Sequence, residues 1–160
     1  MLTEFEQKLV WEGWLSSEIR ANYFADLCHR YRFQQSVLSW LILASSSGAF
    51  TAVIKDFGSD AFRSILALVT VALSLWSLVA QNQKSSTDCS DLHFRWNRLA
   101  SQYESLWSDM YSEEAPTLLV NLKEKSAELS KTGAAFPNKR RLMEKWQDYV
   151  VHQHVADASV

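Results

Sequence analysis

The sequence contains few of the residues that mark disulfide-rich proteins or enzymes. Cysteine occurs only twice in 160 residues, at Cys28 and Cys89, which is too few for a disulfide framework. There is no glycine-rich phosphate loop, no His-Glu-x-x-His motif and no nucleophile elbow. Cys89 and His93 are four residues apart, as in half a zinc site, but no second half is present. We therefore expect no enzymatic activity, no metal and no cofactor.

Charged residues are missing from two long stretches. Phe33 to Ile54 (22 residues) and Ser64 to Gln83 (20 residues) contain no Asp, Glu, Lys, Arg or His. At about 1.5 Å per residue, each stretch reaches roughly 30 Å as a helix, the thickness of a bilayer's hydrocarbon core. Only Lys55–Arg63 separates them. The pattern predicts a transmembrane hairpin over residues 33–83, with spans at 33–54 and 64–83. The alternative is a pair of buried helices in a soluble bundle, which the serines of the first stretch favour.

The distribution of lysine and arginine predicts the orientation of this hairpin. Six cationic residues flank its outer ends: Arg20, Arg30, Arg32, Lys84, Arg95 and Arg98. The connection between the spans carries two, Lys55 and Arg63. Because cytoplasmic flanks carry the excess of positive residues, we expect both termini, and with them both cysteines, on the cytoplasmic side.

The rest of the sequence predicts helices and no strand. Residues 1–32 form a cytoplasmic N-terminal helix, which Gly13 could break and Ser16 or Ser17 could restart. In the tail, apolar residues recur at spacings of 4, 3, 4, 3 and 4: Leu92, Trp96, Leu99, Tyr103, Leu106 and Met110. This seam is typical of a helix that packs along another helix. Two further helices are expected, over Thr117–Lys131 with Leu118, Leu122 and Leu129 inward, and after Pro137-Asn138. The predicted fold class is all-α, with a cytoplasmic helical domain over residues 84–160.

Small and polar residues form stripes within the two spans. In the first span Ala44, Gly48 and Ala52 repeat every four residues, which allows helices to approach closely in lipid. In the second span one face carries Thr70, Ser74, Ser77 and Gln81. These hydroxyls could join helices by hydrogen bonds, or they could line an aqueous pore formed by several copies. No ionisable residue lies inside either span, so a proton relay or a selective ion site is not expected.

Basic residues gather at two places in the tail. They are Lys139, Arg140, Arg141 and Lys145 near the start of the last helix, and Arg95 and Arg98 beside Trp96. If Asn138 caps the last helix, three cations occupy its first turn, where the helix dipole disfavours them. Free backbone N–H groups and guanidinium groups together would suit a phosphate. The alternative is a solvated basic face, or one attracted to anionic lipid headgroups.

The layout resembles the two-transmembrane effectors of prokaryotic antiviral defence, especially the SLATT-type family. The resemblance covers roughly Ile19 to Leu129. It depends on the two-span topology, the short hairpin Lys55–Arg63 and the aromatic tail helix from Phe94 to Tyr103. Similar small membrane effectors act in CBASS and type III CRISPR systems, where a soluble tail binds the signal.

This resemblance implies an oligomeric protein of the bacterial inner membrane, with four or more copies, that permeabilises the membrane when triggered. The implied trigger is a nucleotide second messenger such as a cyclic oligoadenylate, bound by the tail or by a separate sensor protein. No DNA partner is expected. The alternative function is a membrane scaffold or assembly subunit whose seam helix recruits a partner protein.

Overall fold

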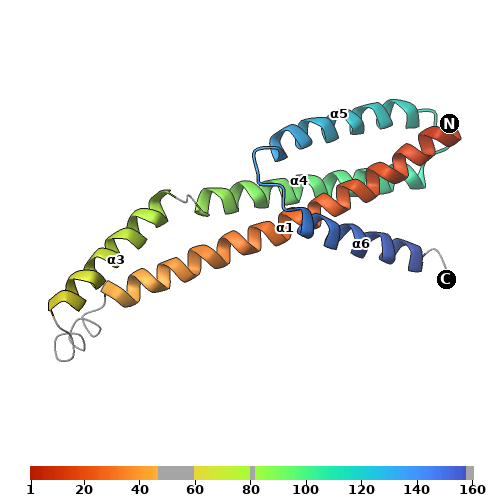
Figure 1. Ribbon diagram of the computed structural model, residues 1–160. Coiled ribbons are helices and arrows are strands. Elements are labelled where there is room, and N and C mark those ends of the chain that lie inside the picture. The colour runs from red at the N-terminus through yellow and green to blue at the C-terminus, as the bar shows by residue number, and fades with distance from the viewer. Residues whose placement is uncertain (47–59, 80–81, 158–160) are drawn as a thin grey trace. The chain divides into compact units, whose positions relative to one another are not determined.

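The computed structural model describes residues 1–46, 60–79 and 82–157, and within these ranges the backbone forms five helices and no strand (Figure 1). The helices are α1 (Glu4–Ser46), α3 (Asp60–Val79), α4 (Asn82–Ser108), α5 (Ala115–Gly133) and α6 (Arg140–Asp157). The all-α prediction is confirmed. Within the same ranges, none of the helices combines the length and the apolar character needed to cross a membrane.

Contacts divide the chain into two compact units. Unit 1 consists of Met1–Asp26 together with Cys89–Val160, and unit 2 consists of Leu27–Asp88. The sequence suggested that residues 1–32 form an element of their own. In the structure most of this segment belongs to the same unit as the tail, because its apolar face is buried there.

The start of α1 is fixed by a capping box. The backbone N–H of Thr3 donates to Glu6 Oε2 at 2.8 Å, and the N–H of Glu6 donates to Thr3 Oγ1 at 3.3 Å. The helix then continues through Gly13, so the predicted break and restart are wrong. Ser17 is buried inside the helix, where its hydroxyl donates to the carbonyl of Gly13 at 2.7 Å instead of capping a new segment.

The seam on α4 forms the core of unit 1. Five of its six members are at most 3% exposed: Leu92, Trp96, Leu99, Tyr103 and Leu106. Among these five, Trp96 is fully buried. The helix that packs along this seam is the N-terminal part of α1. A β-carbon on Gly13 would come within 2.6 Å of the Tyr103 ring, and His93 Nδ1 lies 2.9 Å from the carbonyl oxygen of Ala21. The spacing therefore predicted the buried face of α4 correctly from Leu92 to Leu106. Met110, the sixth member, lies in the turn after α4 and is only half-buried.

Helix boundaries in the tail differ from the expected ones. Helix α3 ends at Val79 and α4 begins at Asn82, so the stretch expected to form the second span, residues 64–83, is shared between two helices. Helix α5 begins at Ala115, with Pro116 in its first turn, where the missing N–H costs nothing. Its buried residues include Leu119 where Leu118 was expected, and Leu118 is 42% exposed. The choice between neighbouring leucines depends on the angle of packing, which spacing alone does not determine.

Within unit 1, helix α6 packs against an aromatic cluster on α1. The His154 ring makes edge contacts with Trp14 and Trp11, at 4.8 and 5.5 Å between ring centroids. His154 Nε2 also lies 2.7 Å from Glu18 Oε2. Trp107 of α4 stacks at a tilt on Trp11, at 5.4 Å. The cluster thus connects the last helix to the first.

Candidate functional site

Unit 2 exposes an unusual amount of apolar surface. From His29 to Ser85, none of the side chains that the structure describes is buried. Eleven large apolar side chains on α1 and α3 are 40% exposed or more: Phe33, Val37, Trp40, Leu41, Leu43, Ile65, Leu68, Val69, Val71, Leu75 and Trp76. Exposed apolar patches of this extent normally mark a surface that lipid or another protein covers.

The polar stripe on α3 lies on the helix face that is less exposed. Thr70, Leu73 and Ser74 are half-buried, whereas Leu75 and Trp76 are exposed. The Ser74 hydroxyl donates to the Thr70 carbonyl of the same helix at 2.9 Å, so this donor is satisfied within α3. The remaining stripe residues Gly48, Ala52 and Gln81, and the side chain of Ser77, lie outside the described part of the chain.

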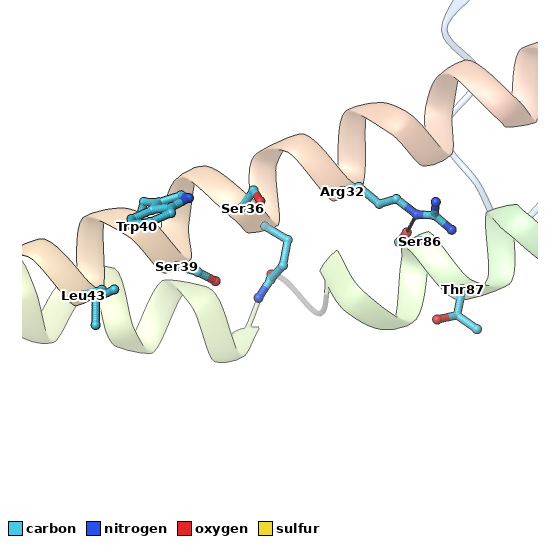
Figure 2. Close-up of a pocket in the computed structure, with 8 residues that line it drawn as sticks. Arg32, Ser36, Ser39, Trp40, Leu43, Ser86 and Thr87 are labelled. Atoms are coloured by element: carbon cyan, nitrogen blue, oxygen red, sulfur yellow. Dashed lines mark hydrogen bonds between the residues drawn. The ribbon is translucent and has the colours of Figure 1, made fainter.

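A hollow of about 580 Å³ lies within unit 2, between α1 and the second turn of α4. Figure 2 shows Arg32 reaching toward Ser86, with Ser36, Ser39 and Trp40 farther along α1. Arg32 Nε donates to Ser86 Oγ at 3.3 Å, and Ser86 is buried. Arg32, predicted only as a topology signal, therefore also links α1 to α4 within unit 2.

Two of the four cations near the start of α6 are paired with acids. The Arg140 guanidinium binds Glu144 at 2.7 Å, and Lys145 Nζ binds Asp26 at 3.2 Å and lies 4.5 Å from the Trp146 ring centroid. The carbonyl of Lys139 accepts the first helical hydrogen bonds, from Leu142 and Met143, so Lys139 caps the helix. The expectation that Asn138 is the cap is wrong, and two cations, Arg140 and Arg141, occupy the first turn instead of three.

Arg95 and Arg98 line a pocket of about 290 Å³ between α4 and α5. Lys125 and Glu128 of α5 line the same pocket, and Lys125 Nζ donates to Gln102 Oε1 at 3.2 Å. Arg95 pairs with Asp91 at 2.8 Å within α4. The pocket thus brings together two predicted cations and a third one from α5. The adjacent residue Trp96 is fully buried in the core, as its place in the seam predicted.

Sequence reasoning missed a second pocket in unit 1, of about 250 Å³. Arg20 of α1, Trp96 of α4 and Ser130 of α5 line it together. The Arg20 guanidinium lies over the Trp96 ring, 4.8 Å from its centroid, and donates to Ser130 Oγ at 2.6 Å. Burial lowers the pKa of Arg20. No spacing in the sequence reveals this grouping, because it joins three helices far apart in the chain.

Comparisons of the chain with protein-family models, with curated proteins and with solved structures find no match.

Proposed function

We propose that this chain is a membrane effector: residues 33–83 insert into a lipid bilayer as a hairpin, and unit 1 remains in water as its control module. The observation that carries the proposal is the apolar surface of unit 2. Its described side chains between residues 29 and 85 include none that is buried, although many are large and apolar. Unit 1, by contrast, has a buried apolar core of its own.

The distribution of charged residues favours lipid, and not a soluble protein, as the partner that covers the apolar surface of unit 2. The two charge-free stretches of the sequence run from Phe33 to Ile54 and from Ser64 to Gln83, so they reach beyond the described parts of α1 and α3. Cations flank them on the outer side, where they can meet anionic headgroups. A soluble partner would leave no reason for charges to be absent from every face of both helices over about 20 residues.

Copies of the hairpin then assemble and permeabilise the inner membrane when unit 1 receives its signal. The resemblance to SLATT-type effectors supports this step, and so does the polar stripe of Thr70 and Ser74 on α3. For a phosphorylated signal such as a cyclic oligoadenylate, the pocket of Arg98 and Lys125 would receive one nucleotide, because at about 290 Å³ it is too small for the whole messenger. At the start of α6, Arg140 and Lys145 already have carboxylate partners. Arg141 and Lys139 would contribute long-range attraction only.

Cysteine labelling tests the insertion. Ser59→Cys, between the stretches, and Ser101→Cys, on the exposed face of α4, are introduced singly into a background without Cys28 and Cys89. A membrane-impermeant maleimide should label the two from opposite sides of the inner membrane. Labelling of both from the same side would contradict the two-span hairpin.

Dye release from liposomes tests the permeabilisation. The full chain is reconstituted with a trapped dye, and cyclic tetra-adenylate is added as the probe. We expect release that depends on the probe and that an Arg98→Gln/Lys125→Gln variant loses. If the chain inserts correctly but releases no dye either with or without cyclic tetra-adenylate, the result would favour the scaffold function, in which unit 1 recruits a partner protein.

A further inference from the structure

The pocket around Arg20 contains a cation whose charge is not balanced by an acid. Arg20 is about half-buried, and none of the carboxylates in the described part of the chain forms an ion pair with it. Its guanidinium has two contacts, the neutral Ser130 hydroxyl and the face of Trp96. Buried charges are normally paired, since removing a charge from water is costly unless an opposite charge or several hydrogen bonds compensate.

Trp96, whose ring contacts this guanidinium, carries a second unsatisfied group. The Nε1–H of Trp96 is buried and has no hydrogen-bond partner among the described residues, although the indole ring itself is fully enclosed. Buried donors without a partner are rare in proteins, and each one needs an explanation. Because the indole is fully enclosed, this N–H does not reach the pocket, and Trp96 offers the pocket only its contact with Arg20. The donors available to a ligand are the guanidinium N–H groups of Arg20, whose planar fork matches a carboxylate or phosphate.

The rest of the pocket is lined mainly by apolar and aromatic residues, with Asn138 as a further polar one. Phe24 of α1, Phe136 and the Tyr23 ring line it. The Tyr23 hydroxyl is already used, since it donates to the Pro137 carbonyl at 2.6 Å and accepts from the Lys139 N–H at 3.2 Å. These residues therefore offer ring faces and few further polar groups. At about 250 Å³ the pocket is smaller than sites for drug-sized ligands, so a dinucleotide would not fit.

We infer that this pocket binds a small organic oxyanion, a carboxylate or phosphate monoester carried by a single flat ring. The oxyanion accepts from the guanidinium of Arg20, and the ring packs against Phe24 and Phe136. All of these residues belong to unit 1, so the inference does not depend on the membrane hairpin. The site is also distinct from the pocket of Arg98 and Lys125, which is lined by different residues.

Calorimetry on the full chain in detergent tests the inference, with benzoate and phenyl phosphate as probes and benzamide as the uncharged control. At least one anion should bind saturably, and benzamide should bind at least tenfold more weakly because it lacks the charge. Arg20→Gln should weaken binding of the anion by roughly ten- to a hundredfold, the loss expected for charge-assisted hydrogen bonds. Arg20→Lys keeps the charge but not the fork, and should give an intermediate affinity. Lys123→Gln, which removes one exposed charge from α5, should bind like the unaltered chain.

The two sources of the oxyanion are distinguished by which probe binds, benzoate for a carboxylate and phenyl phosphate for a phosphate ester. Equal binding of benzamide and the anions would overturn the inference, as would an Arg20→Gln variant that melts normally and binds the anions unchanged. If Arg20→Gln does not fold, the comparison of Arg20→Lys with Lys123→Gln decides. Equal affinities for those two would then overturn the inference. Absence of binding by either anion to the unaltered chain would also overturn it, whatever the result of the liposome experiment.

Discussion

Gly13 of α1 lies directly against the ring of Tyr103 on α4. A β-carbon at position 13 would come within 2.6 Å of two ring carbons, and Tyr103 is 2% exposed, so its ring has little room to move. Alanine improves helix propensity by about 1 kcal/mol over glycine. Overpacking a buried contact costs about 1–3 kcal/mol. We expect Gly13→Ala to lower the free energy of unfolding by about 1 kcal/mol, measured by urea denaturation.

A double-mutant cycle provides the control for this prediction. Tyr103→Ala alone creates a cavity and should cost about 3 kcal/mol or more. In that background Gly13→Ala no longer meets the ring and should be neutral or stabilising. Additive effects of the two substitutions would show that the contact does not limit the approach of α1 to α4.

The seam on α4 could be predicted from sequence because its information is local. Leu92, Trp96 and Leu99 repeat with the helix period, and any helix with such a face must bury it. The partner of the seam could not be predicted in the same way. It is the first helix, and the close approach depends on the absence of a side chain at Gly13, which in the sequence suggested a break. Tertiary packing here stabilises a helix through a residue of poor helix propensity.

The same difference between local and long-range information decides which candidate sites could be predicted from the sequence. Arg95 and Arg98 were found because cations next to aromatic residues are visible in the sequence, and the structure places both at one pocket. Arg20 was seen only as a charge near a span. Its contacts with Trp96 and Ser130 join positions far apart in the chain, and a single sequence contains no signal for such contacts.

The capping box of α1 leads to a prediction about how the stability of the fold depends on pH. Hydrogen bonds from the backbone and the side chain of Thr3 lower the pKa of Glu6 below its ordinary value of 4.5. A carboxyl group with a lowered folded-state pKa contributes stability above its unfolded pKa, and this contribution is lost as the pH falls through the folded value. We therefore expect the stability difference between the unaltered chain and Glu6→Gln to be present at pH 6 and to shrink below pH of about 4. Urea midpoints of both proteins across this range measure it, and a difference independent of pH would contradict the prediction.

The ion pair of Arg140 on α6 leads to a prediction about the free energy of unfolding. Three unpaired cations in a first turn would repel each other, and removing one would stabilise the helix. Arg140, however, binds Glu144 one turn later, and its side chain is 89% exposed. Exposed pairs at this spacing contribute about 0.3–0.5 kcal/mol. Arg140→Ala should thus change the unfolding free energy by less than about 0.5 kcal/mol, with Arg141→Ala as the matched variant at the neighbouring position. A gain of about 1 kcal/mol or more for Arg140→Ala would mean that repulsion dominates despite the pair.

The last prediction separates the two roles of the polar stripe on α3. Ser74 lies on the half-buried face, and its hydroxyl donates to the Thr70 carbonyl of its own helix, so it is not needed as a donor to another helix. If this face lines a pore in the proposed assembly, Ser74→Leu should keep insertion and oligomerisation but abolish dye release from liposomes, because an apolar constriction dewets. Ser74→Ala, which removes the hydroxyl without adding bulk, should reduce release only partly. Val71→Leu provides the matched control: it adds one methylene on an exposed apolar position of the same helix and should leave release unchanged. The oligomer is measured by chemical crosslinking in the same liposomes. If Ser74→Leu instead loses the crosslinked oligomer while the remaining copies still release dye, the stripe holds helices together and the pore runs along another surface.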